Sequence, residues 1–241
     1  MRVVLPPMTE AQTQVWSALL DLHTMMPTGW TLVGGQMVHL HCAERGMTPQ
    51  RPTDDLDAVL DVRANPQALH DFTTVLARLG FRSAGTSPAG HQHRWVRGLA
   101  SIDVLIPSGV GERASARRGV SGGTTLQTPA AQQALDRTGD VDVVVAGREG
   151  VVRRPNLLGA LVAKAAAYHI TSDTARSRHL VDFAVLTTLI VPSDHVGEAT
   201  ARDRRRLVSA VGALVAEKRT LVAVEGAVDG LAVLRRALGI D

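Results

Sequence analysis

The sequence predicts an α+β fold, in which a mixed β-sheet with flanking helices is followed by an all-helical C-terminal part. Two patterns support this prediction. Up to about residue 152, short apolar runs with the two-residue period of strands alternate with segments that have the period of helices. Beyond that point only helical segments follow. We therefore predict two domains, residues 1–152 and residues 153–241, of which the second closes a cleft in the first.

In the first part, helical and strand-like segments surround a pair of glycines. A helix at 8–26 has Thr9 as its N-cap, and a short strand, Trp30–Val33, ends at Gly34 and Gly35. A tight turn at Gly98 joins two later strands. The remaining predicted elements are, in order, a helix at 36–44, a strand at 55–62, a helix at 66–80, the strands at 93–98 and 100–107, a glycine-rich basic loop at 108–123, and a hairpin of residues 140–147 and 149–153.

The second part is predicted to contain four helices. Their apolar residues recur at helical spacing, and the first helix has Pro155 near its start, a position that proline favours. The predicted helices cover residues 155–170, 174–190, 198–219 and 228–239.

The composition indicates an apolar core and no membrane-spanning segment. Hydrophobic residues make up 45% of the chain and aromatic residues only 3%, so Leu, Val and Ala must form most of the core. The longest apolar run, Phe183–Val191, is too short to span a bilayer. Cys42 is the only cysteine, which excludes an intramolecular disulfide. These features predict a cytoplasmic protein without a membrane partner.

The positive charge comes almost entirely from arginine. The formal net charge is +3, and Lys164 and Lys218 are the only lysines. A mildly basic balance permits a polyanionic partner such as RNA without requiring one, and arginine suits bidentate contacts with phosphate. A GC-rich coding bias is the better explanation for most of these arginines.

One segment, residues 32–62, combines features suited to a triphosphate and a metal. Gly34 and Gly35 let the backbone approach a ligand closely, and the helix start after them offers free N–H groups to an anion. Asp55 and Asp57 project from one face of a strand, where their carboxylates suit Mg²⁺ or Mn²⁺. If that strand lies beside the first one, phosphates and metal meet, as nucleotidyl transfer requires. A turn followed by a solvated acidic face is the alternative.

This segment resembles the signature of the nucleotidyltransferase superfamily, a Gly-Gly or Gly-Ser pair followed by an Asp-x-Asp strand. More narrowly, "VGGQMVHLH" and "RPTDDLDAVLDV" are similar to segments of the AbiEii-type nucleotidyltransferases of abortive-infection and toxin–antitoxin systems. The resemblance implies that Gly34, Gly35 and Gln36 bind an NTP and that Asp55 and Asp57 bind metal. Gln36 stands where Ser or Thr is common, and "RGMTPQ" lengthens the loop before the acidic strand.

The resemblance also implies a third carboxylate on a later strand, which binds metal and orients or deprotonates the acceptor hydroxyl. Asp103 in "SIDVLIP" stands at this point. An aspartate in the middle of an apolar strand is unfavourable without a partner, which favours a functional role over that of an edge-strand residue. His91, His93 and Arg94 flank a neighbouring strand and are expected at the surface or in contact with the acceptor.

Lys164 is the only formal charge between Pro155 and Ser172. Its neighbours at helical spacing are apolar, so we expect it to point towards the core or a cleft and to pair with Asp182 or with a bound phosphate. The alternative is a lysine that lies along the edge of an apolar stripe.

The resemblance implies a helical lysine as well, followed by a helix with basic residues ahead of an aspartate. In this chain Arg176, Arg178 and Asp182 fit that pattern, and His179 stands where an acid is usual. Lys164 and Arg178 would then contact the nucleotide, and Lys164 and Asp182 would belong to the catalytic set.

Together these features predict a metal-dependent nucleotidyltransferase that moves an NMP from an NTP to a hydroxyl. The acceptor stays open between a tRNA end, a protein side chain and a small antibiotic, and the resemblance implies a cognate antitoxin as a further partner. The basic run Arg202–Arg206 is either a solvated helix face or a contact for RNA phosphate. A nucleotide- or RNA-binding module on the same fold, without transfer activity, is the second hypothesis.

Overall fold

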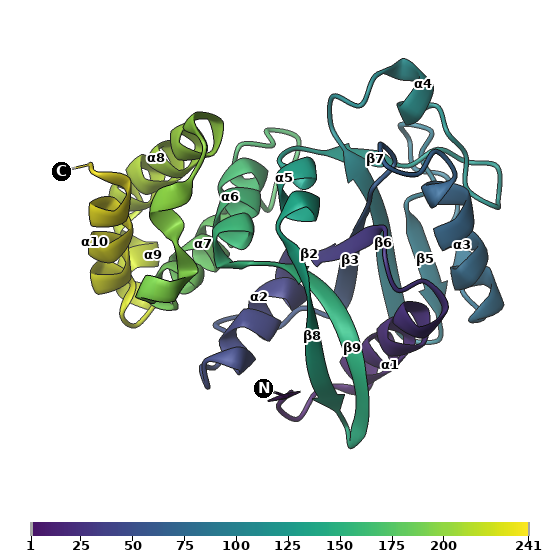
Figure 1. Ribbon diagram of the computed structural model, residues 1–241, viewed down its shortest axis with the longest axis horizontal. Helices are drawn as coiled ribbons and strands as arrows, with labels where there is room; N and C mark the ends of the chain where they lie inside the picture. Colours follow the sequence, from purple (N-terminus) through teal and green to yellow (C-terminus); the bar gives the residue numbers. More distant parts are fainter. Residues whose placement is uncertain (1, 241) are drawn as a thin grey trace.

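The computed structural model describes residues 2–240 and confirms the α+β class. The first part contains two sheets with flanking helices, and a group of helices lies at the other end of the molecule (Figure 1). The larger sheet has the strand order β2-β3-β6-β5-β4, with β7 also paired to β6. The smaller sheet has the order β1-β8-β9. None of the helices in the described residues has the length and apolar character needed to cross a membrane.

The elements follow the predicted order closely. The strands are β1 (Val3–Val4), β2 (Trp30–Val33), β3 (Asp55–Leu60), β4 (Arg82–Ser83), β5 (Arg94–Arg97), β6 (Ala100–Pro107), β7 (Leu126–Thr128), β8 (Thr138–Val145) and β9 (Arg148–Pro155). The α-helices are α1 (Glu10–Met25), α2 (Gly34–Glu44), α3 (Ala68–Arg78), α4 (Glu112–Ser115), α5 (Ala131–Asp136), α6 (Leu157–Tyr168), α7 (Ser177–Thr188), α8 (Ala201–Ala216), α9 (Lys218–Ala223) and α10 (Ala227–Leu238). Two 3₁₀ turns, Pro192–Asp194 and Val196–Glu198, precede α8.

Strand register brings the predicted acidic residues together. β2 runs antiparallel to β3 with Val33 opposite Asp57, which confirms that the acidic strand lies beside the first strand. β3 runs parallel to β6 with Asp57 opposite Asp103. β5 and β6 form the expected hairpin around Gly98, and this register sets Arg94 opposite Asp103.

A continuous hydrophobic core runs through both parts of the chain. Leu, Val and Ala dominate it as expected, and Trp16, Trp30, Phe72 and Phe183 are its largest fully buried side chains. Residue 152 lies within β9, and the division into two domains stays a prediction.

Several short elements were not predicted from the sequence. They are β1, β4, β7, α5 and α9, together with α4 inside the loop predicted at 108–123. The helix predicted from residue 66 begins at Ala68, and the helix predicted at 198–219 ends at Ala216, before α9. Segments this short hold less than two full hydrophobic repeats, so their pattern does not distinguish them from loops.

Candidate active site

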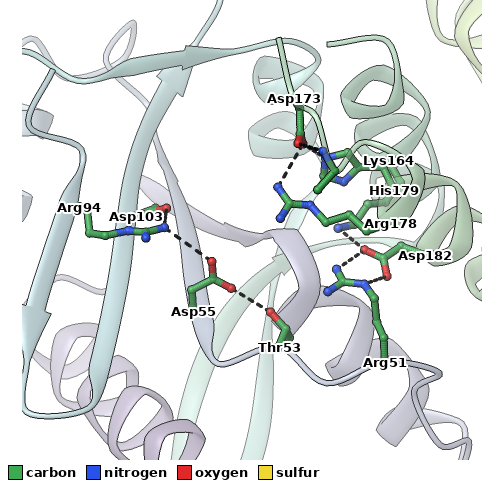
Figure 2. Close-up of polar contacts among 11 residues, drawn as sticks. Arg51, Thr53, Asp55, Arg94, Asp103, Lys164, Asp173, Arg178, His179 and Asp182 are labelled. Carbon is green, nitrogen blue, oxygen red and sulfur yellow. Dashed lines mark hydrogen bonds and ion pairs between the residues drawn. The ribbon is translucent and has the colours of Figure 1, made fainter. Parts of the chain in front are cut away.

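A cleft of about 390 Å³ lies between the acidic strands of the larger sheet and the helices α6 and α7. Figure 2 shows the charged residues on its two sides. The predicted site residues that line it are Gly34, Gly35, Asp55, Asp57, Asp103, Lys164 and Arg178. Gln36 and Asp182 do not line it. The structure thus gathers in one cavity most of the residues for which the sequence predicted a role.

The glycine pair allows the start of α2 to approach β3 closely. Gly34 has a φ of +73°, and a Cβ atom at this position would overlap the Asp57 carboxylate. A Cβ atom on Gly35 would lie 2.7 Å from Cγ2 of Thr53, closer than side chains pack. The N-cap residue, Val33, offers no side-chain hydrogen bond to the first turn of α2. The backbone N–H groups of this turn are therefore free to bind an anion.

The Asp57 carboxylate on β3 is buried close to two other carboxylates. Burial, together with the nearby Asp55 and Asp103 carboxylates, raises the pKa of Asp57 to about 7, although Lys164 and Arg178 oppose this rise. Asp55 accepts a hydrogen bond of 2.9 Å from the Thr53 hydroxyl. Crowded carboxylates of this kind are stabilised by a cation.

Arg94, which was expected at the surface or in contact with the acceptor, lines the cleft, but the sequence reasoning did not pair it with Asp103. Its Nε and Nη2 atoms donate to the two oxygens of Asp103 at 2.8 and 2.7 Å. The same Nη2 lies 3.8 Å from Oδ2 of Asp55 (Figure 2). The hydrogen bond to Asp103 is the main cause that raises the pKa of Arg94. The sequence did contain a signal for this pair. A hairpin that turns at Gly98 sets Arg94 directly opposite Asp103.

The donor set of the cleft fits a divalent cation at Asp55 and Asp57. Both residues belong to β3 and line the cleft, and carboxylate oxygens are the ligands that Mg²⁺ prefers. Asp103 is engaged by Arg94. Within residues 2–240, no group of three or more His, Cys, Asp or Glu side chains is arranged as a metal cluster. The three-carboxylate metal site therefore stays a prediction.

Lys164 is buried and pairs with Asp182, as one of the two sequence interpretations predicted. Its Nζ lies 2.7 Å from Oδ2 of Asp182, and both side chains are less than 5% exposed. Arg51, from the loop before β3, donates to the two oxygens of Asp182 at 2.8 and 2.7 Å. Burial by itself would raise the pKa of Asp182, but the positive charges of Lys164 and Arg51 outweigh burial and hold the pKa below its usual value. Asp182 thus positions Lys164. The contact of Arg51 with Asp182 was not predicted, because no local sequence pattern indicates it.

Arg178 and His179 share a different partner, Asp173. Arg178 Nη2 and His179 Nε2 lie 3.1 and 2.9 Å from its Oδ2. Burial, with the positive charge of Lys164 next, lowers the pKa of His179 to about 4. The imidazole, which stands where the resemblance implies an acid, is therefore neutral at pH 7.

The side chain of Gln36, a residue that the resemblance places in the nucleotide-binding set, has a structural role. It is 1% exposed, accepts a hydrogen bond from Trp16 Nε1 at 2.9 Å and donates one to the Thr53 carbonyl at 2.6 Å. Because both ends of the amide are occupied, only the backbone N–H of Gln36 is left for a phosphate.

The fold is nucleotidyltransferase-like. The solved structure of an antigenic nucleotidyltransferase-like protein from Paracoccidioides brasiliensis is similar, with a TM-score of 0.53, 16% identity and 93% coverage of both chains. The solution structure of the antibiotic-resistance factor ANT(2'')-Ia has a TM-score of 0.44 and 13% identity, with coverage of 88% of this chain and 97% of the other. No family model and no curated protein matches the sequence. At these identities the likeness shows the fold alone, and the AbiEii-type assignment stays a prediction.

Asp57→Asn should stabilise the metal-free protein, and more so at pH 8 than at pH 5. The folded-state pKa of about 7 exceeds the unfolded value of about 3.9. Ionised Asp57 therefore costs stability increasingly as the pH rises between these values, and the amide has no charge to desolvate. Urea unfolding in EDTA at both pH values measures the difference.

The exposed neighbour Asp54 provides the control, because Asp54→Asn should change little at either pH. Two outcomes would contradict the cost of ionising Asp57. One is a D57N variant that is less stable than the wild type at pH 8. The other is a change in the free energy of unfolding that is the same at pH 5 and pH 8.

Asp182→Asn should destabilise the fold more than Lys164→Met does. The first change leaves two cations without their buried carboxylate, which costs about 3–5 kcal/mol for such pairs. After the second change, Arg51 still neutralises Asp182. Urea unfolding at pH 7 measures both free energies, with Lys218→Met, at the other and exposed lysine, as the matched control. A K164M variant as stable as the K218M control would argue against the buried pair.

Proposed function

We propose that the protein is a metal-dependent nucleotidyltransferase that moves an NMP from an NTP to a hydroxyl acceptor. The observation that supports this proposal most strongly is the composition of a single cleft. A helix start led by two glycines, the carboxylates of β3 and β6, and a buried lysine of α6 all contribute to its walls. These are the groups needed to hold a triphosphate beside a divalent cation.

Each group in the cleft has a role in the proposed reaction. The N–H groups of Gly34 and Gly35 bind phosphate oxygens, and Lys164 with Arg178 neutralises the opposite side of the triphosphate. Asp55 and Asp57 hold Mg²⁺ or Mn²⁺, which would neutralise charge at the attacked phosphorus. Asp103 orients the acceptor hydroxyl or accepts its proton. Residues 153–241 act as a helical domain that closes the cleft over residues 1–152.

The alternative is a nucleotide- or RNA-binding module on the same fold without transfer activity. Two observations favour it over a standard enzyme site. Asp103 is held by Arg94, and neutral His179 replaces the usual acid. The toxin-like role, a cognate antitoxin and a cytoplasmic location rest on the sequence alone and are proposed on that basis.

For the acceptor we propose an RNA such as a tRNA end, in preference to a protein side chain or a small antibiotic. A second cleft of about 300 Å³ is lined by Arg63, Arg137, Arg202 and Arg206, and it shares Ala131 with the first cleft. Within residues 2–240, Arg63 and Arg202 have no carboxylate partner, so both can bind phosphate. An acceptor chain across both clefts would place its end beside the carboxylates.

Asp55→Asn should greatly weaken Mg²⁺-dependent NTP binding and abolish transfer while the fold stays intact. The change removes one of the two carboxylate charges proposed to hold the cation. Calorimetry with and without Mg²⁺ measures binding, and a labelled NTP incubated with total RNA and protein extract measures transfer. The D54N variant is the matched control. If D55N binds NTP like the wild type, the site assignment is wrong, whereas binding without any transfer by the wild type favours the binding-module hypothesis.

Neutralising Arg63 and Arg202 together should weaken RNA binding and flatten its salt dependence. Each lost phosphate contact reduces the slope of log K against log salt by about 0.7–0.9. Fluorescence anisotropy of a labelled tRNA between low and moderate salt measures this slope for R63Q/R202Q. The control is R219Q/R236Q, which removes the same charge at exposed arginines outside both clefts. Equal slopes for the two double variants would exclude the second cleft as the RNA site.

A further inference from the structure

The guanidinium of Arg94 lies between two of the three carboxylates that β3 and β6 contribute to the cleft. It belongs to β5, bonds to Asp103 of β6 through two parallel hydrogen bonds and reaches across β6 towards Asp55 of β3 (Figure 2). The Arg94 side chain is 47% exposed and lines the cleft, whereas the Asp103 side chain is only 11% exposed. The charged group is thus presented to the place where a ligand would bind.

Arg94 occupies both oxygens of Asp103, so neither is free to bind a metal ion. Nε bonds to Oδ1 and Nη2 bonds to Oδ2, so both oxygens of this carboxylate are engaged. Such bidentate pairs are among the strongest polar contacts in proteins, and the guanidinium does not lose its proton at accessible pH. A metal ion at Asp103 would first have to break this pair.

Asp57 lacks a comparable partner. Within residues 2–240, no Lys, Arg or His side chain forms an ion pair with the Asp57 carboxylate, which lies against the backbone of Gly34 at the start of α2. One cation is therefore supplied by the chain at Asp103, while the pair Asp55 and Asp57 still requires another. The charge of the cleft is consistent with one external cation.

We infer that Arg94 is a built-in cation that takes the place of one metal ion at Asp103. The protein then binds one divalent ion, through Asp55 and Asp57, and Arg94 holds the Asp103 carboxylate oriented beside it through two hydrogen bonds. This inference rests on the proposed nucleotidyltransferase function, because it assigns the cation positions of the same cleft. A hairpin ion pair with no influence on metal binding is the alternative that an experiment has to exclude.

Binding of Mn²⁺ to the nucleotide-free protein tests this inference without any measurement of activity. Electron paramagnetic resonance counts free and bound Mn²⁺ for the wild type and for R94M, R94K and D103N. We expect one bound ion per chain in the wild type and R94K, which keeps the charge, and a second bound ion in R94M. We expect no more than a small change in D103N, because Asp103 is not a metal ligand.

Asp55→Asn is the positive control, and we expect it to weaken Mn²⁺ binding by more than the about 10–100-fold typical of outer-shell changes. Two ions bound to the wild type, one ion bound to folded R94M, or a loss in D103N as large as that in D55N would each overturn the role of Arg94. If R94M does not fold, the comparison of Mn²⁺ binding by D103N and D55N still tests whether Asp103 is a metal ligand. If the wild type binds no Mn²⁺ even with an NTP analogue present, the proposed metal dependence fails as well.

Discussion

The buried carboxylate of Asp182 joins the two parts of the chain. It bonds to Lys164 of α6 and to Arg51 of the loop that leads into β3. Because removing a charge from water is expensive, this buried carboxylate is stable only with a positive partner beside it. Arg51 lies four residues before Asp55, so the same contact fixes how the helices face the acidic strand. The width of the cleft and the position of its lysine both depend on this interaction.

Each wall of the cleft carries charges of both signs. Three carboxylates and Arg94 belong to the strands, with Asp57 opposite Asp103 in register, whereas Lys164, Arg178 and Asp173 lie on the side of the helices. A triphosphate with a bound cation suits this arrangement, since the cation would lie towards the strands and the phosphates towards the helices and the start of α2. Burial, together with the neighbouring Asp55 and Asp103 carboxylates, raises the pKa of Asp57 to about 7. Arg94 bonds to Asp103 and lies 3.8 Å from Asp55, but it forms no ion pair with Asp57.

Much of the fold and of the cleft could be predicted from the sequence, because the strands and most helices carry clear periodicity. The glycine pair, the acidic strand and Lys164 with Asp182 were found through local patterns of this kind. Arg51 lies in an irregular loop and meets Asp182 only through tertiary packing, so no periodicity could identify it. Gln36 was assigned to the nucleotide by its position, but its amide is used by Trp16 and by a backbone carbonyl from outside its helix. Such contacts depend on the folded chain.

A crystal structure with Mn²⁺ and a non-hydrolysable NTP analogue tests the central claim most directly, because anomalous scattering locates the metal without ambiguity. The claim is that one cleft binds the triphosphate and its cation together. We expect Mn²⁺ bound to Asp55 and Asp57, with phosphate oxygens against the N–H groups of Gly34 and Gly35. A nucleotide bound elsewhere, or a metal ion that does not contact Asp55 and Asp57, would contradict the claim.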